Sequence, residues 1–185
     1  QCTLLVLDEG DERIVAATLE IVHDAAMANG AQVGDVELVE KWMHHRNNTS
    51  GLQEATRRGF IVDTMEVAAQ WSALEAIFTN VRASLMAVEG AVSATCHLSH
   101  SYLDGACLYF TFAAKPTSEF EQRYVQLWNA CQRSALESGA NVSHHHGVGL
   151  NRGRFLPESL GTGMDVLQSI KNTLDPRNIF NPGKL

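Results

Sequence analysis

Three consecutive histidines, His144–His146, are the most unusual chemical feature of the sequence, and a Gly-Val-Gly segment follows them. Imidazole changes its charge near neutral pH and also ligates metals, so the run could transfer protons or hold a metal ion. In an extended strand, His144 and His146 would share one face and His145 would take the other. The spacing does not choose between proton chemistry, metal binding and a third interpretation, in which one histidine is structural and the others are solvated.

Other potential ligands are scattered along the chain. His97 and His100 could add ligands if the histidine run holds a metal. There are also four cysteines: Cys2, Cys96, Cys107 and Cys131. Because no two of them form a Cys-x-x-Cys pair, they indicate free thiols in a reducing compartment rather than a disulfide framework or a zinc site.

The composition is that of a folded, acidic chain. Its 185 residues suffice for one domain, or for a domain and a tail. Hydrophobic residues make up 45% and charged residues 19%, which argues against disorder. The formal net charge of −7 excludes the basic surface of a nucleic-acid-binding protein. No apolar run approaches the ~20 residues that a membrane-spanning helix needs.

The spacing of apolar residues predicts the elements that must position these side chains. We expect strands over residues 2–7, 59–65, 92–102 and 106–113, and helices over 11–30, 34–46, 74–85 and 120–139. This order predicts an α+β fold, in which helices cover one side of an antiparallel sheet and a helical tail follows. A domain seldom opens within a strand, so the first strand indicates that the chain is part of a longer protein.

The two central strands form a predicted hairpin. A three-residue loop over 103–105 would pair Leu98 with Phe110 and Ser99 with Tyr109, with the glycine of the loop in a left-handed conformation. In this register Tyr109 leaves the helix-covered core and faces whatever lies across the sheet. A solvated surface tyrosine is the alternative interpretation.

Several segments resemble a known family. The motifs are the histidine run with its glycines at 144–149, the Leu-Gly pair at 160–161, the ending at 174–185, and the stretches 4–11, 66–71 and 101–110. Together they resemble the carboxyl-terminal part of flavin-linked oxidases of the vanillyl-alcohol oxidase type, and within them the alkyldihydroxyacetonephosphate synthase branch. The resemblance implies FAD as the cofactor, held by an upstream α/β domain.

The resemblance also implies a division of the chain. Residues 1–140 would form the cap, or substrate, domain with a ferredoxin-like sheet over the flavin ring. Residues 141–185 would return to the FAD-binding domain. The implied reaction exchanges the acyl chain of acyl-dihydroxyacetone phosphate for a fatty alcohol through a flavin N5 adduct, a step of ether lipid synthesis. The chain alone would then be inactive.

Site residues carry over from the matching motifs. Those implied to be catalytic are Tyr109, His145 and His146. Those implied to contact substrate are Arg46, His144 and Tyr102, and those implied to contact the cofactor are Gly147, Asn181 and Lys184. A planar guanidinium such as that of Arg46 suits a phosphate or carboxylate.

Two other functions stay open. Related flavin dehydrogenases carry a metal-ligating His-x-x-Asp-Gly-Asn-x-His pattern on this hairpin. Ser101 stands where that pattern begins, so the resemblance implies no metal. An FAD-dependent oxidase or dehydrogenase of a 2-hydroxy acid or an alcohol is nevertheless the alternative, because the Asn-Pro-Gly-Lys ending is closer to that branch. The second alternative is a non-catalytic α+β binding module.

The expected partners are a small lipid-phosphate substrate and the upstream FAD-binding domain of the same protein, without nucleic acid. Association with a membrane surface and assembly into a homodimer stay open. The last three residues, Gly-Lys-Leu, are not a peroxisomal address, so we expect a cytoplasmic location.

Overall fold

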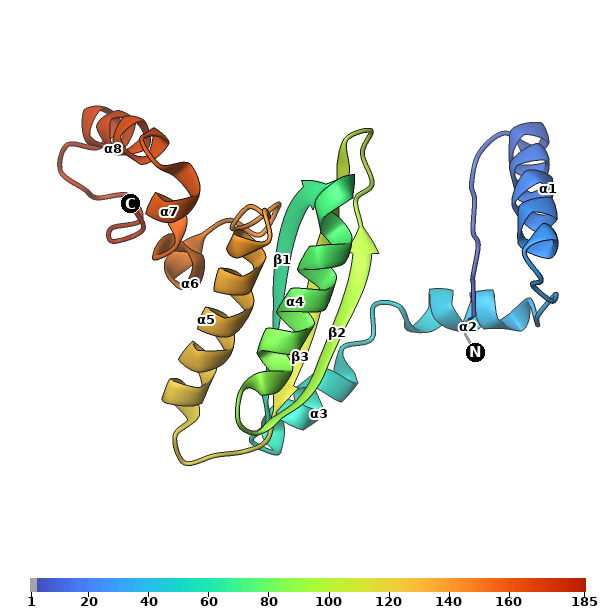
Figure 1. The fold of residues 1–185 in the computed structure, drawn as a ribbon, viewed down its shortest axis with the longest axis horizontal. Helices are drawn as coiled ribbons and strands as arrows, with labels where there is room; N and C mark the ends of the chain where they lie inside the picture. The colour runs from blue at the N-terminus through green and yellow to red at the C-terminus, as the bar shows by residue number, and fades with distance from the viewer. Residues whose placement is uncertain (1–2) are drawn as a thin grey trace. The chain divides into compact units, whose positions relative to one another are not determined.

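The computed structural model describes residues 3–185, and the chain divides into two compact units, Gln1–Gly51 and Leu52–Leu185 (Figure 1). The boundary that we predicted at residue 140 lies inside the second unit and stays a prediction. In the described part of the chain, no helix is both long and apolar enough to span a bilayer.

The first unit contains two predicted helices, α1 (Glu12–Ala28) and α2 (Glu37–His45). Asp11 is the N-cap of α1, whereas Asp35 lies one residue before Val36, the N-cap of α2. Asp11 Oδ1 accepts from Arg13 N at 3.0 Å, and Asp35 Oδ1 accepts from Glu37 N at 2.9 Å. The predicted start of α1 is confirmed, and α2 begins three residues later than predicted.

The predicted opening strand is wrong for residues 3–7, which have no strand structure, whereas Cys2 lies outside the described residues. Leu4 is 73% exposed. A lone extended segment gains ladder hydrogen bonds only beside another strand, and the described residues provide none next to it. The apolar pattern alone does not supply that neighbour.

An additional helix, α3 (Ser50–Arg57), was not predicted. The polar residues before it indicated only a break. The Asn48 side chain accepts a hydrogen bond from Ser50 N at 2.9 Å, and an ion pair of 2.9 Å joins Arg58 Nε to Glu54 Oε1. These local polar contacts favour a helix in a segment that has few apolar residues.

The second unit is built on a three-stranded antiparallel sheet in the order β1-β3-β2, which confirms the predicted α+β class. Its strands are β1 (Ile61–Gln70), β2 (Ala91–Ser99) and β3 (Gly105–Ala114). A short 3-10 turn, η1 (Trp71–Ala73), leads into α4 (Leu74–Ala87). That helix packs beside α5 (Phe120–Glu137) on one face of the sheet (Figure 1).

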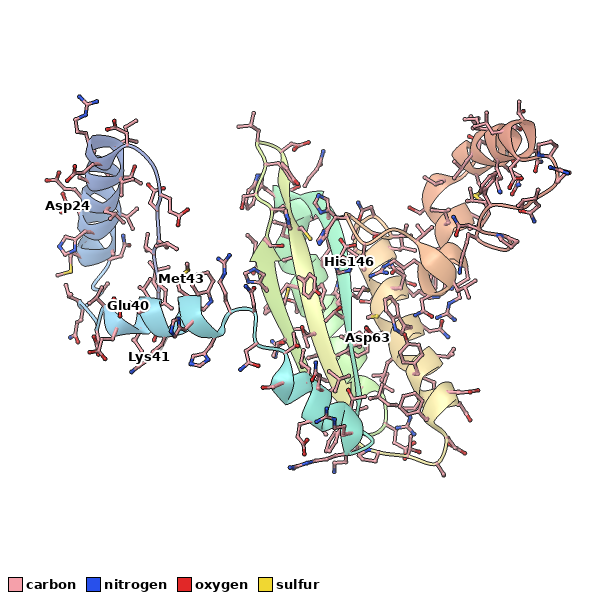
Figure 2. All side chains as sticks on the ribbon, turned by 180° about the vertical axis from the view of Figure 1, so that it is seen from behind. Asp24, Glu40, Lys41, Met43, Asp63 and His146 are labelled. Carbon is pink, nitrogen blue, oxygen red and sulfur yellow. The ribbon has the colours of Figure 1, made fainter. Side chains whose placement is uncertain are left out.

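The core lies between this helix pair and the sheet. Alternate residues of β3 enter it, as strand geometry requires. Large, fully buried side chains come from both the sheet and the helix pair: Phe110, Phe112, Met65, Ile77, Leu85, Leu127 and Trp128. On the same face, Asp63 of β1 accepts hydrogen bonds from Tyr124 Oη at 2.7 Å and Trp128 Nε1 at 2.9 Å, which fasten α5 to the sheet (Figure 2).

The hairpin keeps the predicted faces but has another register. Leu98 pairs with Leu108 and Ser99 with Cys107, two residues away from the predicted partners. The shift is even, so each side chain stays on its face. The loop is longer because Trp71 holds it at two points: its backbone N–H donates to Asp104 O at 3.2 Å, and its Nε1 donates to Tyr102 O at 3.1 Å.

Gly105 is required because the backbone of β1 lies very close to it. It does not adopt the left-handed conformation that we predicted. A Cβ there would lie 2.1 Å from the carbonyl oxygen of Ala69 in β1, and the left-handed residue of the loop is His100, with φ 51°. Gly105→Ala should therefore lower the free energy of unfolding by about 3 kcal/mol or more, measured by urea denaturation. Gly51→Ala, which meets open space in α3, is the control and should be neutral or stabilising. An equal stability of both variants would contradict the packing argument.

The helical tail follows as predicted, with α6 (Gly149–Gly153), α7 (Leu156–Leu160) and α8 (Gly163–Leu174). A small second core forms around Val142, Phe155 and Leu156. Beyond α8, Asp175 organises the final turn: its carboxylate pairs with Lys171 and accepts from the N–H groups of Ile179 and Phe180, both at 2.9 Å.

The final turn should be sensitive to acid. The Lys171 ammonium and the two backbone donors lower the pKa of Asp175 from 3.8 to about 2. A carboxylate with a lowered pKa stabilises the fold above its ordinary pKa, and that contribution is lost as the pH falls from 3.8 towards 2. Amide exchange of the tail should therefore differ between wild type and Asp175→Asn at pH 6 and converge at about pH 2. A difference that persists at the lower pH would contradict this assignment.

Candidate functional site

The open face of the sheet, opposite α4 and α5, carries the predicted tyrosine. Tyr109 is half-buried on β3 and pairs with Glu66 of β1 and His97 of β2, so these three side chains share the face. The Tyr109 hydroxyl donates to Thr64 Oγ1 at 3.2 Å. The prediction that this phenol leaves the helix-covered core is confirmed.

Glu66 is fully buried on this face because the loop after α5 covers it. Asn141 attaches that loop to the free edge of β1: its side chain accepts from Ala68 N at 2.8 Å, and its N–H donates to Ala68 O at 3.1 Å. The loop then turns so that successive N–H groups reach one carboxylate. Ser143 Oγ donates to Glu66 Oε1 at 2.6 Å, and His144 N to Oε2 at 2.7 Å.

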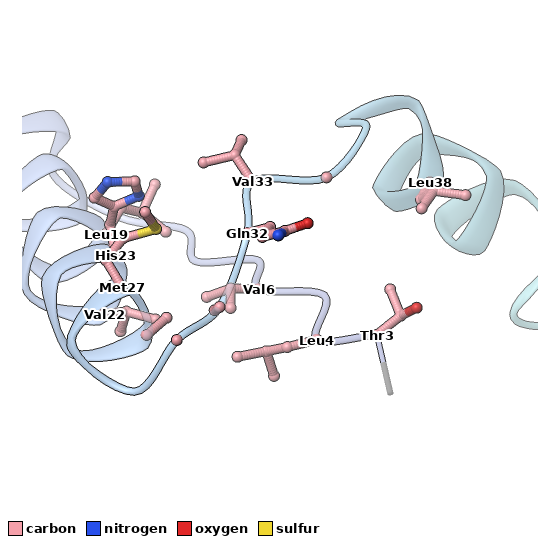
Figure 3. Close-up of a pocket in the computed structure, with 14 residues that line it drawn as sticks. Thr3, Leu4, Val6, Leu19, Val22, His23, Met27, Gln32, Val33 and Leu38 are labelled. Carbon is pink, nitrogen blue, oxygen red and sulfur yellow. The ribbon is translucent and has the colours of Figure 1, made fainter. Parts of the chain in front are cut away.

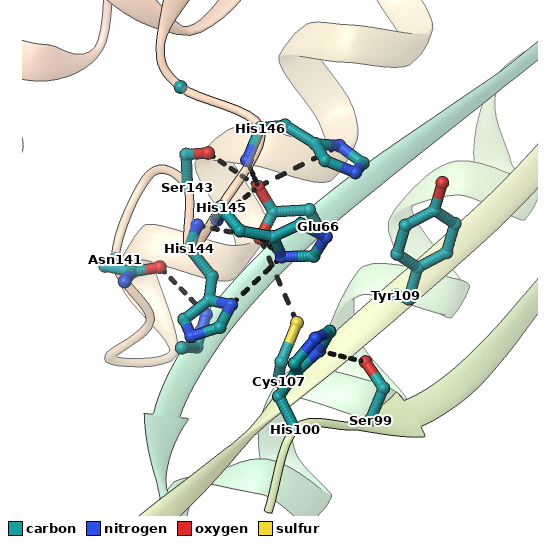
Figure 4. Close-up of polar contacts among 12 residues, drawn as sticks. Glu66, Ser99, His100, Cys107, Tyr109, Asn141, Ser143, His144, His145 and His146 are labelled. Atoms are coloured by element: carbon teal, nitrogen blue, oxygen red, sulfur yellow. Dashed lines mark hydrogen bonds and ion pairs between the residues drawn. The ribbon is translucent and has the colours of Figure 1, made fainter.

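Two further backbone N–H groups also donate to the Glu66 carboxylate. His145 N and His146 N donate to Glu66 Oε1 at 3.3 and 3.0 Å (Figure 4). Burial by itself raises the pKa of Glu66, but the Ser143 hydroxyl and the three backbone N–H groups outweigh it and hold the pKa below its ordinary value. Glu66 is therefore an anion that fixes the backbone of all three histidines.

The histidine run does not form an extended strand. In a strand successive N–H groups point to opposite sides, whereas here three in a row converge on Glu66, so the loop is bent. The imidazoles consequently gather on one side. Ring centroids of neighbouring histidines lie 5.2 Å (His144–His145) and 4.4 Å (His145–His146) apart.

The cluster connects the hairpin loop to the tyrosine. The His146 ring meets the Tyr109 ring edge-on with centroids 5.4 Å apart. At the other end, Tyr102 Oη lies 3.0 Å from His144 Nε2, and the His100 ring lies 4.8 Å from that of His145. Of these groups, the Tyr102 hydroxyl and the His144 imidazole are within hydrogen-bond distance and can exchange a proton, and protonated imidazoles of the cluster would attract an anionic substrate.

The structure thus brings together five of the predicted site residues: Tyr102, Tyr109 and His144–His146. Gly147 follows them, with φ 72°, and its carbonyl accepts from Arg152.

The remaining predicted residues have contacts elsewhere. Lys184 N donates to Asn181 O at 3.4 Å within the final turn. Arg46 belongs to the first unit, where its guanidinium lies 5.3 Å from the centroid of the Trp42 ring. Their roles toward cofactor and substrate stay predictions.

Sequence reasoning missed Glu66, Ser143 and Cys107. The signal for Glu66 was an acidic residue between Met65 and Val67, both fully buried, because a carboxylate there needs compensating donors. Cys107 lies beneath the cluster, with its Sγ 3.9 Å from Glu66 Oε2, and burial raises the pKa of its thiol. Cys96, Cys107 and Cys131 are free, as predicted.

A pocket in the first unit offers different chemistry. It lies between residues 3–6, α1 and the segment after it, and apolar side chains line most of it (Figure 3). His23 is the only titratable group among the described residues that line it. It therefore lacks the convergent polar groups of the open sheet face.

Comparisons with known proteins identify the family of the chain. The family model of FAD linked oxidases, C-terminal domain, matches residues 1–185. An uncharacterized FAD-linked oxidoreductase, YgcU, of Escherichia coli O157:H7 is 27% identical over 200 residues, covering 100% of this chain and 41% of its own length. Alkyldihydroxyacetonephosphate synthase of Dictyostelium discoideum is 26% identical over 191 residues, covering 100% of this chain and 31% of its own length.

A solved alkyldihydroxyacetonephosphate synthase structure has the same fold, with a TM-score of 0.61 and 22% identity over 94% of this chain and 30% of that chain. The chain thus spans less than half the length of these relatives. The match of the family model over all 185 residues is the decisive finding. The chain belongs to the FAD-linked oxidases, whose C-terminal domain it forms, and its cofactor is FAD.

Proposed function

We propose that the protein exchanges the acyl chain of acyl-dihydroxyacetone phosphate for a fatty alcohol, as an enzyme of the alkyldihydroxyacetonephosphate synthase type. The observation that carries the proposal is the contact of Tyr109 with His146 on the open sheet face. Similarity over the whole chain to a synthase of this name supports it.

The open face fits a flavin. Because Tyr109 donates to Thr64, the Thr64 hydroxyl and the His97 ring on the same face are left to donate to the carbonyl and nitrogen atoms of a flavin ring. FAD, when bound, supplies an electrophilic and redox-active ring at this surface. Gly147, Asn181 and Lys184 are the proposed contacts to the cofactor.

In this proposal, residues of this chain remove a proton from the substrate and later return it. Tyr109 Oη takes the proton from the carbon beside the substrate carbonyl, and His146, whose ring lies edge-on to that of Tyr109, is the proposed group that receives this proton. His145 is the second proposed acid–base group. Tyr102 and His144, joined by their hydrogen bond, are the proposed substrate contacts of the second unit, and Arg46 would bind phosphate.

The reaction balances without an external oxidant. The bond between the terminal carbon of the dihydroxyacetone unit and the ester oxygen of the acyl group breaks, and the fatty acid leaves with the electron pair of that bond. The alcohol oxygen forms the new ether bond, its proton goes to solvent, and the proton held at Tyr109 returns to carbon. The net change is a substitution, with no oxidation.

A second function is favoured by the whole-chain similarity to an FAD-linked oxidoreductase. In that case the same tyrosine and histidines would take the hydroxyl proton of a 2-hydroxy acid or an alcohol during its oxidation. The cytoplasmic location, a membrane-surface contact and a homodimer remain predictions.

The two functions can be separated with the full-length, FAD-containing protein. Acyl-dihydroxyacetone phosphate and a labelled fatty alcohol are supplied without an electron acceptor, and the labelled ether is measured. In parallel, 2-hydroxy acids and alcohols are supplied with a reducible dye. Ether formation without acceptor supports the exchange reaction. Dye reduction without ether formation would replace it by the second function.

A further inference from the structure

A second chemical feature lies beside the proposed proton-transfer pair. His100, Cys107, His144 and His145 each offer one ligand atom, and these four atoms lie within 4.8 Å of one another. They come from the β2–β3 loop, from β3 and from the loop after α5. We propose that these four side chains bind one zinc ion.

The ligand set is the first argument. Three imidazole nitrogens and one thiolate sulfur are ligands that zinc prefers in four-coordinate sites. Zinc binds nitrogen at about 2.0–2.1 Å and sulfur at about 2.3 Å, which separates tetrahedral ligands by about 3.3–3.6 Å. The Nδ1 atoms of His144 and His145 are already 3.0 Å apart. The exposed ring of His145 can rotate to bring its nitrogen closer.

The outer contacts are the second argument, because metal-bound histidines use their other ring nitrogen for a hydrogen bond. Tyr102 Oη contacts His144 Nε2 at 3.0 Å, which leaves Nδ1 toward the cluster. Ser99 Oγ contacts His100 Nδ1 at 3.0 Å, which leaves Nε2. Both hydroxyls therefore hold an imidazole in an orientation that frees its second nitrogen.

Charge is the third argument. Cys107 is fully buried beside the Glu66 carboxylate, with Sγ and Oε2 3.9 Å apart. On zinc binding the thiol proton leaves to solvent and a zinc–sulfur bond forms. The dication would then balance the thiolate and the buried carboxylate together, and Glu66 would support the ligands without binding the metal itself.

The proposal goes beyond the proposed function and does not depend on it. A bound zinc would replace the substrate contact proposed for His144 and the acid–base role proposed for His145, and it would leave Tyr109 and His146 for the reaction. It also replaces the expectation of no metal, which rested on Ser101.

The test measures zinc in the full-length FAD-containing protein, after growth with zinc and dialysis against metal-free buffer. We expect about one zinc per flavin, and X-ray absorption at the zinc edge should show sulfur at about 2.3 Å together with nitrogen at about 2.0–2.1 Å. Cys107→Ser and His100→Ala should each weaken zinc binding by more than the roughly 10–100-fold that loss of an outer contact costs. The second variant changes an exposed loop side chain, so it tests the site even where the first fails to fold.

Two matched controls lie on the neighbouring strand. Cys96→Ser and His97→Ala change the same residue types outside the cluster and should retain the zinc, counted per protein chain because His97 also lies on the proposed flavin surface. Wild-type protein without zinc, or zinc that all four variants retain, would overturn the proposal. Because no substrate is used, this result is separate from success or failure of the exchange reaction.

Discussion

Replacing Tyr109 by phenylalanine should lower kcat by about 10²–10⁴-fold, the usual contribution of a positioned acid or base. The change removes one hydroxyl, whose hydrogen bond to Thr64 Oγ1 is 3.2 Å long, and leaves the aromatic ring against His146. Folding and flavin content should therefore be preserved. The measurement is the rate of ether formation at saturating substrate, with circular dichroism and the flavin-to-protein ratio on the same samples.

Tyr124→Phe is the matched control for this prediction. Its hydroxyl is also hydrogen-bonded, to Asp63 at 2.7 Å, but it lies on the helix-covered side of the sheet. Losing that bond should cost about 1–3 kcal/mol of stability and leave kcat nearly unchanged below the melting temperature. Full activity in Tyr109→Phe, or an equal loss in both variants, would contradict the assignment of Tyr109 as the base.

Glu66→Gln should release the histidine loop. The amide retains one acceptor oxygen, but its NH₂ group would face the N–H groups that the carboxylate now accepts. We expect the free energy of unfolding to fall by about 1.5–3 kcal/mol, the value of one hydrogen bond to a charged group. Amide exchange at residues 144–146 should accelerate, and activity should fall because the imidazoles lose their positions.

Glu75→Gln makes the same chemical change at an exposed position in the first turn of α4. It should cost at most about 1 kcal/mol through the helix dipole and leave the histidine amides protected. Unchanged exchange at residues 144–146 in Glu66→Gln would show that the carboxylate does not hold the loop.

The sequence predicted features that depend on local spacing. The periodic apolar residues of α4 and α5 gave both helices, and the alternation in β3 gave the face of Tyr109. A strand has a side-chain period of two, so even the wrong register left Tyr109 on the correct face.

Features that depend on distant contacts were missed. The length of the hairpin loop follows from two hydrogen bonds to Trp71, about thirty residues earlier in the chain. The bent histidine loop follows from Glu66, 78 positions before His144. Neither partner is visible in the local pattern. Cys107 resembled an isolated thiol for the same reason, because its neighbours come from two loops.

The most direct test of the central claim is an anaerobic flavin spectrum of the full-length protein, recorded before and after acyl-dihydroxyacetone phosphate is added. We expect the oxidised flavin absorbance to fall in the wild type, with release of fatty acid and no electron acceptor present, and to stay unchanged in Tyr109→Phe. An unchanged wild-type spectrum without fatty acid release would contradict the exchange reaction. Bleaching by a 2-hydroxy acid in the same cuvette would then identify the protein as a dehydrogenase.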